Sequence, residues 1–279
     1  MPQTSETHPV GVFDSGIGGL TVLSAIQKLL PNESLLYLGD TARVPYGTRS
    51  PETVQRYAER VASHLWQEGV KALVIACNTA STYALDPLAK AGKLLGIPVL
   101  GVIEPGVQEA LQATRSGRVV VLGTEGTVTG GKYQELLKQG GVEVEALACP
   151  LFVALAEEGW TDGPIATAVA ERYLSSLESD PDTVILGCTH YPLLAPTLQA
   201  LLPKVVLIDS AQATARSLHR ALRESDLLNT HSPSTERFLV TDHVSRFVRS
   251  GTAFLGRTPS PVELVDLDPA RAPFAEASS

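Results

Sequence analysis

The stretch ALVIACNTAS, residues 72–81, and its counterpart TVILGCTHYP, residues 183–192, decide the fold of this chain. Each begins as an apolar run rich in β-branched residues, which is typical of a strand buried in a sheet. Each then reaches a cysteine, Cys77 or Cys188, followed by small hydroxyl and amide side chains. Because parallel strands present ligand-contacting residues at their carboxyl ends, both cysteines are expected at a functional edge.

Four pairs of predicted strand ends recur in the same order at offsets of 105 to 111 residues, as the numbering shows. The pairs are Asp14 with Thr124, Asp40 with Cys149, Cys77 with Cys188, and Glu104 with Asp209. A period of this length is the size of a domain, so it indicates an internal duplication rather than a solenoid. Strands alternate with helical patterns throughout. The sequence therefore predicts an α/β fold of two pseudo-symmetric parallel-sheet domains, with the active site in the cleft between them.

The predicted domains follow from this repeat. Residues 1–98 and 210–256 form the first α/β lobe, which carries Cys77, and residues 99–209 form the second, which carries Cys188. The helix and strand after Asp209 have no partner in the second repeat, so they are expected to return to the first lobe. Residues 257–279 are predicted to be a C-terminal tail, mobile at its end because it is rich in Pro, Ala and Ser.

Composition excludes several classes of partner. The formal net charge of −8 argues against binding to nucleic acid or to an anionic membrane. The apolar run at 94–103 is half the roughly 20 residues that a membrane-spanning helix needs, and the polar residues 1–8 lack a signal-peptide pattern. Three cysteines without a CxxC pair do not form a disulfide framework, so a cytoplasmic protein with reduced thiols is expected.

The two strand-end cysteines are the first candidates for chemistry. A single buried cysteine is more often structural, but two at equivalent ends of duplicated strands favour a function. If they meet across a cleft, one thiolate can take a proton while the other thiol gives one. The alternatives are a redox pair and a metal site. No metal is expected, because the chain offers no further Cys or His at ligand spacing.

Acidic and basic groups near these cysteines are candidates to assist them. Asp14 ends the first strand and could orient or deprotonate a thiol, and His190 lies two residues beyond Cys188 and titrates near neutral pH. Asp40 and Glu157 are weaker candidates, because an acid in a loop is usually solvated. Hydroxyls and amides at the strand ends fit either helix capping or ligand binding. They are Ser15, Asn78, Thr79, Thr124 and Thr189.

Two further features are interpreted as structural. Residues 126–132 match most of a phosphate-binding loop, but Tyr133 stands where Ser or Thr would have to bind magnesium. Cys149, the third thiol, lies beside Pro150 in an apolar setting.

Four motifs together resemble one family, the cofactor-independent glutamate racemases. They are DSGIGGL at 14–20, GDTARVPYG at 39–47, ACNTAS at 76–81 and GCTHYPL at 187–193. The resemblance covers residues 10–255 and implies a two-base mechanism without a cofactor, supplying D-glutamate for peptidoglycan. It implies that Cys77 faces the D-isomer with help from Asp14, and Cys188 the L-isomer with help from His190. Asp40 and Glu157 would have secondary roles.

The same resemblance implies the groups that contact glutamate. They are Asp14, Ser15, Pro45, Tyr46, Gly47, Asn78, Thr79, Thr124, Thr189 and His190. Near Glu157 the chain departs from the family, which usually has Pro where Ala154 stands and a branched residue at Ala156, so the position of Glu157 stays open. Members of the family dimerise in different ways, so a homodimer also stays open.

Three other functions compete with this interpretation. A racemase of the same two-thiol class could act on aspartate or a hydantoin. A non-catalytic, two-lobed amino-acid-binding protein would not need both thiols. A thiol redox protein would form a Cys77–Cys188 disulfide reversibly.

Overall fold

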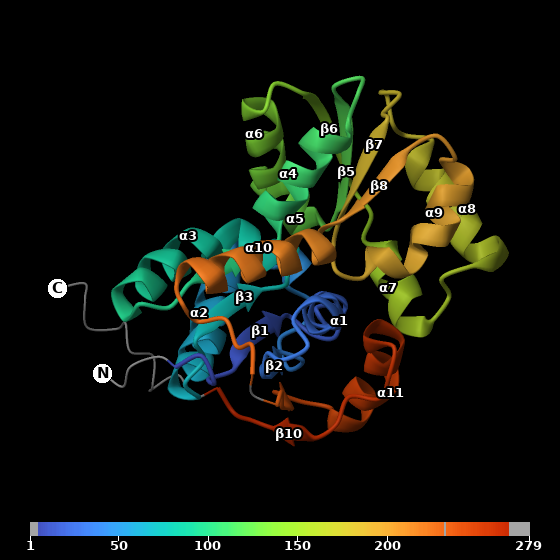
Figure 1. The fold of residues 1–279 in the computed structure, drawn as a ribbon. Coiled ribbons are helices and arrows are strands. Elements are labelled where there is room, and N and C mark those ends of the chain that lie inside the picture. Colours follow the sequence, from blue (N-terminus) through green and yellow to red (C-terminus); the bar gives the residue numbers. More distant parts are fainter. Residues whose placement is uncertain (1–4, 232, 268–279) are drawn as a thin grey trace.

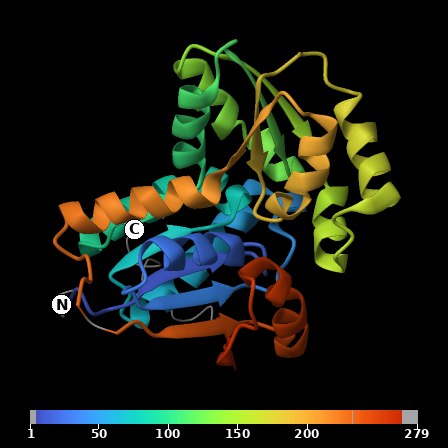
Figure 2. The same cartoon turned by 45° about the vertical axis from the view of Figure 1, so that its right-hand side comes forward.

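The computed structural model describes residues 5–231 and 233–267, and it contains two parallel sheets. The six-stranded sheet has the order β10-β9-β2-β1-β3-β4, and the four-stranded sheet has the order β6-β5-β7-β8. The first sheet comprises β1 (Val10–Asp14), β2 (Leu35–Gly39), β3 (Ala72–Ile75), β4 (Val99–Gly101), β9 (Glu236–Val240) and β10 (Val262–Leu264). The second comprises β5 (Arg118–Gly123), β6 (Glu143–Ala148), β7 (Thr183–Gly187) and β8 (Val206–Asp209). Figures 1 and 2 show the smaller sheet standing above the larger one, with a lobe built around each.

The order of strands confirms two pseudo-symmetric α/β domains. The run β2-β1-β3-β4 in the first sheet is matched by β6-β5-β7-β8 in the second. In both runs every pairing is parallel. The cysteine-bearing strands β3 and β7 therefore occupy equivalent places. Both are buried along their whole length, as their uninterrupted apolar sequences predict.

Helices cover both sheets. They are α1 (Leu20–Leu29), α2 (Pro51–Gln67), α3 (Asn78–Leu95), α4 (Ile103–Ala113), α5 (Glu125–Gly130), α6 (Lys132–Gln139), α7 (Leu151–Glu158), α8 (Gly163–Leu174), α9 (Ala195–Leu201), α10 (Ser210–Glu224) and α11 (Val244–Leu255), with short 3₁₀ turns η1 (Tyr46–Thr48) and η2 (Tyr191–Leu194). Local sequence sets several ends. Ser50 caps α2 ahead of Pro51 by accepting a hydrogen bond from the Thr53 N–H, and Gly96 ends α3 in the left-handed region.

The chain crosses between the lobes twice. It leaves the first lobe after β4, and α4 packs against β7 and β8 of the second. It returns after β8 through α10, which packs against α1 and α4 and lies along the junction in Figure 1. Beyond α10, β9 pairs with β2 and so adds to the first sheet.

Two short strands differ from the predicted domain limits. The predicted second lobe begins at residue 99 and so includes β4, but β4 pairs with β3 in the first sheet. β10 lies in the predicted tail, yet it pairs with β9 and extends the same sheet. Both strands have three residues, too few to give a clear apolar pattern. The rest of the predicted tail, 268–279, lies outside the described residues.

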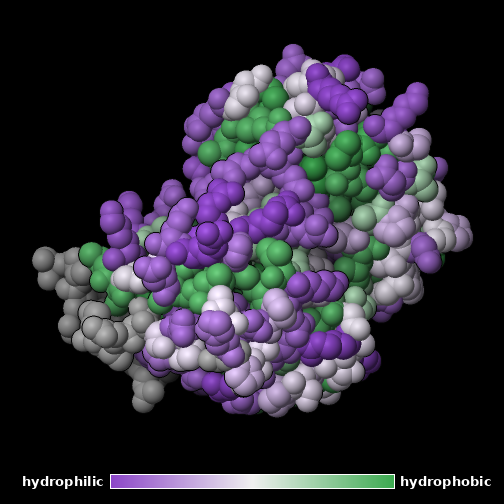
Figure 3. Space-filling model, in the orientation of Figure 1, coloured by the Kyte–Doolittle hydropathy of each residue, from purple (hydrophilic) through white to green (hydrophobic). Residues whose placement is uncertain are grey.

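Polar residues cover most of the face seen in Figure 3, with apolar residues in patches between them on both lobes. Within the described ranges, none of the helices has the length and apolar character needed to cross a membrane.

Candidate active site

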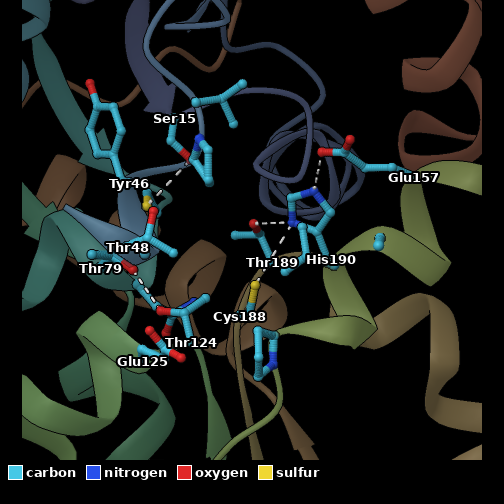
Figure 4. A pocket seen from close by; sticks show the side chains of 18 of the residues that line it. Ser15, Tyr46, Thr48, Thr79, Thr124, Glu125, Glu157, Cys188, Thr189 and His190 are labelled. Atoms are coloured by element: carbon cyan, nitrogen blue, oxygen red, sulfur yellow. Dashed lines mark hydrogen bonds and ion pairs between the residues drawn. The ribbon is translucent and has the colours of Figure 1, made fainter. Parts of the chain in front are cut away.

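A cavity of about 410 Å³ is lined by residues that follow β1, β3, β5 and β7, so both lobes contribute to it. All the candidate residues from the sequence line it except Asp14 and Asp40. The lining candidates are Ser15, Pro45, Tyr46, Gly47, Cys77, Asn78, Thr79, Thr124, Glu157, Cys188, Thr189 and His190. In Figure 4, Cys188, Thr189, His190 and Glu157 lie toward one side of the cavity, and Tyr46, Thr79 and Thr124 lie toward the other.

Cys77 comes from the first lobe, where it follows β3 and caps α3. Its Sγ accepts a hydrogen bond from the Ala80 N–H at 3.5 Å and lies 3.8 Å from Ser15 Oγ. Burial, and after it the charge of Asp14, raise the pKa of Cys77 to about 12, although the Ala80 contact lowers it. Cys77 is therefore a thiol at neutral pH. A cationic group bound beside it would favour the thiolate.

Cys188 comes from the second lobe, where it directly follows β7, and its sulfur contacts the His190 ring. The His190 ring places Nδ1 3.8 Å from Cys188 Sγ, while Nε2 lies 3.3 Å from Glu157 Oε1. Burial alone would lower the pKa of His190, but its hydrogen bonds to Cys188 and Glu157 raise that pKa to about 10. His190 is therefore an imidazolium at neutral pH, within reach of the Cys188 sulfur and the Glu157 carboxylate.

Asp14 does not line the cavity but lies behind its wall, with 1% of its surface exposed. Its carboxylate accepts hydrogen bonds from the Gly16 N–H at 2.9 Å and the Thr189 hydroxyl at 3.4 Å. Burial raises the pKa of Asp14. The contact with Thr189 needs the glycine turn, because a Cβ on Gly18 would overlap Thr189 Oγ1 and lie 2.5 Å from His190 Nδ1. Gly18 therefore lets the first lobe approach the second at the site.

Asp40 was expected to take part in catalysis, but the structure places it beneath the 43–47 loop, away from the cavity. Its side chain is fully buried and accepts hydrogen bonds from Arg43 at 2.7 Å, the Tyr46 hydroxyl at 2.7 Å and the Thr241 hydroxyl at 2.9 Å. Asp40 is thus held by three partners and does not line the cavity. Its position suits it to fix the shape of the loop instead.

The remaining lining groups provide hydrogen-bonding positions. The Thr79 and Thr124 hydroxyls lie 2.9 Å apart, one from each lobe. Asn78 accepts a hydrogen bond from the Tyr133 hydroxyl at 2.7 Å, while its Nδ2 has no partner within the described part of the chain. A buried amide donor without a partner is costly, so Asn78 is prepared for a ligand that accepts a hydrogen bond. Asn78 also begins α3, whose N-terminus favours anions.

The two interpretations of structural residues fit their surroundings. Tyr133 is buried and donates its hydroxyl hydrogen bond to Asn78, so it does not act as a residue of a phosphate-binding loop. Cys149 is fully buried outside the cavity lining, and burial raises its pKa to about 12. Among the described residues, no group of three or more His, Cys, Asp or Glu side chains could hold a metal ion.

Sequence reasoning missed part of the lining. The missed residues are Val44, Thr48, Glu125, Pro150, Val153, Ala154 and Arg246. Val44 lies inside the motif at 39–47, Thr48 directly follows that motif, and Glu125 directly follows the candidate Thr124. Arg246 is different, because it lies on α11, far from any of the motifs.

Comparison with known proteins gives a consistent result. A family model described as Asp/Glu/Hydantoin racemase matches residues 16–218. The glutamate racemase of Geobacter metallireducens is 50% identical over 264 residues, which cover 93% of this chain and 97% of that protein. The glutamate racemase of Aquifex aeolicus is 47% identical over 90% of this chain and 96% of its own length. The glutamate racemase of Francisella tularensis, solved in complex with D-glutamate, superposes with a TM-score of 0.89 at 39% identity, covering 94% of this chain and 99% of that one.

Proposed function

This chain belongs to the Asp/Glu/hydantoin racemase family, and from that premise we propose that it interconverts L- and D-glutamate by moving the α-proton between Cys188 and Cys77. One observation carries the proposal. Two thiols from equivalent strand ends of two duplicated lobes line a single cavity. A racemase that works with two bases needs such a pair, one on each side of the carbon whose proton is exchanged.

The reaction from L- to D-glutamate then has two proton transfers. Cys188, as thiolate, takes the α-proton, and Cys77, as thiol, gives a proton to the opposite face of the same carbon. The enzyme is left with Cys188 as thiol and Cys77 as thiolate, the state that starts the reverse reaction. His190, an imidazolium beside Cys188, stabilises the thiolate form of Cys188 that starts this direction. It can also donate a proton to the Cys188 sulfur. Asp14, close behind the first-lobe wall, has the opposite effect on Cys77, because its charge raises the pKa of that cysteine and so favours the thiol that gives the proton in this direction.

Substrate recognition rests on neutral donors. Glutamate carries two carboxylates, and Arg246 is the only Lys or Arg among the described residues of the cavity lining. The unpartnered Asn78 amide, the N-terminus of α3 and the hydroxyls of Thr79, Thr124 and Thr189 supply donors instead. Donors held in fixed positions around the cavity also stabilise the carbanion-like charge that develops when the α-proton leaves.

The wider setting follows from this chemistry. D-glutamate made here would supply peptidoglycan synthesis, and a cytoplasmic location would keep both thiols reduced. The homodimer that the family resemblance leaves open stays a prediction.

Racemisation of glutamate by the purified, reduced protein without added cofactor tests the proposed function. The expected result is loss of optical rotation from either isomer, with glutamate preferred to aspartate by about 10- to 200-fold, because one missing methylene weakens binding by that much. A stronger reaction with aspartate would assign the chain to that substrate. Binding of glutamate without loss of rotation would favour the two-lobed binding protein.

Asp40→Asn should weaken substrate binding more than turnover. The change removes the ion pair with Arg43 that helps to hold the loop carrying Pro45 and Tyr46. We expect KM for glutamate to rise roughly 10-fold, the loss of one charged hydrogen bond, while kcat stays within about 3-fold. Steady-state kinetics would check this, with the exposed Asp86→Asn as control. A large fall in kcat at unchanged KM would restore a catalytic role for Asp40.

A further inference from the structure

Figure 1 shows helix α11 of the first lobe next to α7 of the second, and a residue of each helix lines the cavity. The contact is an ion pair in which Arg246 Nη2 donates to Glu157 Oε2 at 3.1 Å. Both residues line the cavity. Arg246 has no counterpart in the motifs that predicted the site, and its role is not explained by proton transfer at either thiol.

Glu157 divides its two oxygens between the lobes. Oε2 receives Arg246, and Oε1 lies 3.3 Å from His190 Nε2. The other ring nitrogen of His190 lies 3.8 Å from Cys188 Sγ. A continuous chain of contacts therefore runs from a half-exposed guanidinium on α11 to the buried thiol of the second lobe, through one carboxylate and one imidazole.

The same helix also contacts His190 directly. Phe254 lies near the opposite end of α11 from Arg246. Its ring packs edge to face against the His190 imidazole, with ring centroids 5.1 Å apart and an interplanar angle of 76°. Phe254 is buried. Helix α11 thus contacts the imidazole directly with one residue and holds its carboxylate partner with another, so the orientation of His190 depends on where α11 lies.

We propose that Arg246 is a positioning residue for proton transfer at Cys188: by holding Glu157 against His190, it couples the place of α11 to the orientation of the imidazole. The inference rests on the proposed function, since it concerns the same reaction. It assigns the effect to one side of the site only. The sulfur of Cys77 contacts Ser15 and Ala80, and neither residue lies on α11 or α7.

Burial supports a positioning role over a stabilising one. The Arg246 side chain is 56% exposed and that of Glu157 is 20% exposed. Ion pairs at such sites contribute little to the stability of the fold. The loss of Arg246 should therefore leave the protein folded and show itself in turnover.

The test compares Arg246→Gln with the matched control Arg249→Gln, which removes the same charge one turn along the exposed face of α11. We expect Arg246→Gln to lower kcat about 5- to 30-fold, a part of what general acid–base catalysis contributes, with KM changed less than about 3-fold. Arg249→Gln should match the wild type. Arg246→Lys should recover most of the rate, because only one guanidinium nitrogen makes the contact.

Isotope effects separate positioning from general loosening. With Cα-deuterated L-glutamate, Cys188 removes the label, so slowing that step should raise the isotope effect on kcat/KM in Arg246→Gln. With Cα-deuterated D-glutamate, Cys77 removes the label and Cys188 acts second, so the isotope effect should fall. Equal changes in both directions, or a lysine variant as slow as the glutamine one, would overturn the proposal.

A second readout does not depend on turnover. The ¹⁵N resonances of the His190 ring in the ligand-free protein report its hydrogen bonds, and they should shift in Arg246→Gln but not in Arg249→Gln. Unchanged resonances would overturn the positioning role even in an active enzyme. Shifted resonances in a protein that does not racemise glutamate would support the contact and reject the proposed function.

Discussion

Cys188→Ser is expected to abolish racemisation, lowering kcat in both directions by at least about 10³-fold. A serine hydroxyl in place of the thiol keeps the size of the side chain but is far harder to ionise, so it can neither take the α-proton nor return it at a useful rate. Cys77→Ser should have the same effect on racemisation, because each direction uses both groups.

The two variants should differ in what they retain. In deuterated water, Cys188→Ser keeps Cys77 and should still exchange the α-proton of D-glutamate without inverting it. Cys77→Ser keeps Cys188 and should exchange only L-glutamate. Proton NMR of each isomer measures this, with Cys149→Ala, outside the cavity lining, as the control that keeps activity. Exchange of the opposite isomers would reverse the assigned faces, and undiminished racemisation in either serine variant would exclude the two-thiol reaction.

Lys71→Met is expected to cause the largest loss of stability, about 3–5 kcal/mol, because it leaves a buried carboxylate without its partner. Lys71 Nζ lies 2.6 Å from Glu33 Oε2, and neither side chain is exposed. Lys71 also donates to the backbone carbonyl of Glu6, and Glu33 accepts the Asn229 N–H at 2.8 Å. Burial lowers the pKa of Lys71, and the hydrogen bond that Lys71 donates to Glu33 opposes that shift.

Urea unfolding of the variant measures this loss, with Lys90→Met on the exposed face of α3 as control. The control should lie within about 0.5 kcal/mol of the wild type. The double variant Lys71→Met with Glu33→Leu should recover much of the stability, because no charge is then left buried. If the free energy of unfolding of Lys71→Met alone lies within about 1 kcal/mol of the wild-type value, the buried pair does not hold these segments together.

Much of the fold could be predicted because the strands are buried on both faces. The uninterrupted apolar runs of β3 and β7 mark them as strands of parallel sheets, and their shared ending in cysteine reveals the duplication. The three-residue strands β4 and β10 could not be placed in this way. Their pairing is decided by neighbours that are distant in sequence, β3 and β9 respectively.

The site residues likewise include some that local sequence predicts and some that it does not. Cys77, Asn78, Cys188 and His190 follow strand ends directly, so the topology alone brings them to the cavity. Asp40 also follows a strand, but Tyr46 and Thr241 take up its carboxylate, and the contact with Thr241 depends on the pairing of β9 with β2. Arg246 reaches the site only through the packing of α11, which no local pattern encodes.

The measurement that tests the central claim most directly is the first turnover of unlabelled L-glutamate in deuterated water, followed by proton NMR with the isomers separated. Two bases on opposite faces predict that the D-glutamate formed early carries deuterium at Cα, while the remaining L-glutamate keeps its proton. The reverse experiment should give deuterated L-glutamate from D-glutamate. Early product that retains the original α-proton would mean that one group serves both faces, and it would contradict the assignment of Cys188 and Cys77 to opposite sides of the substrate.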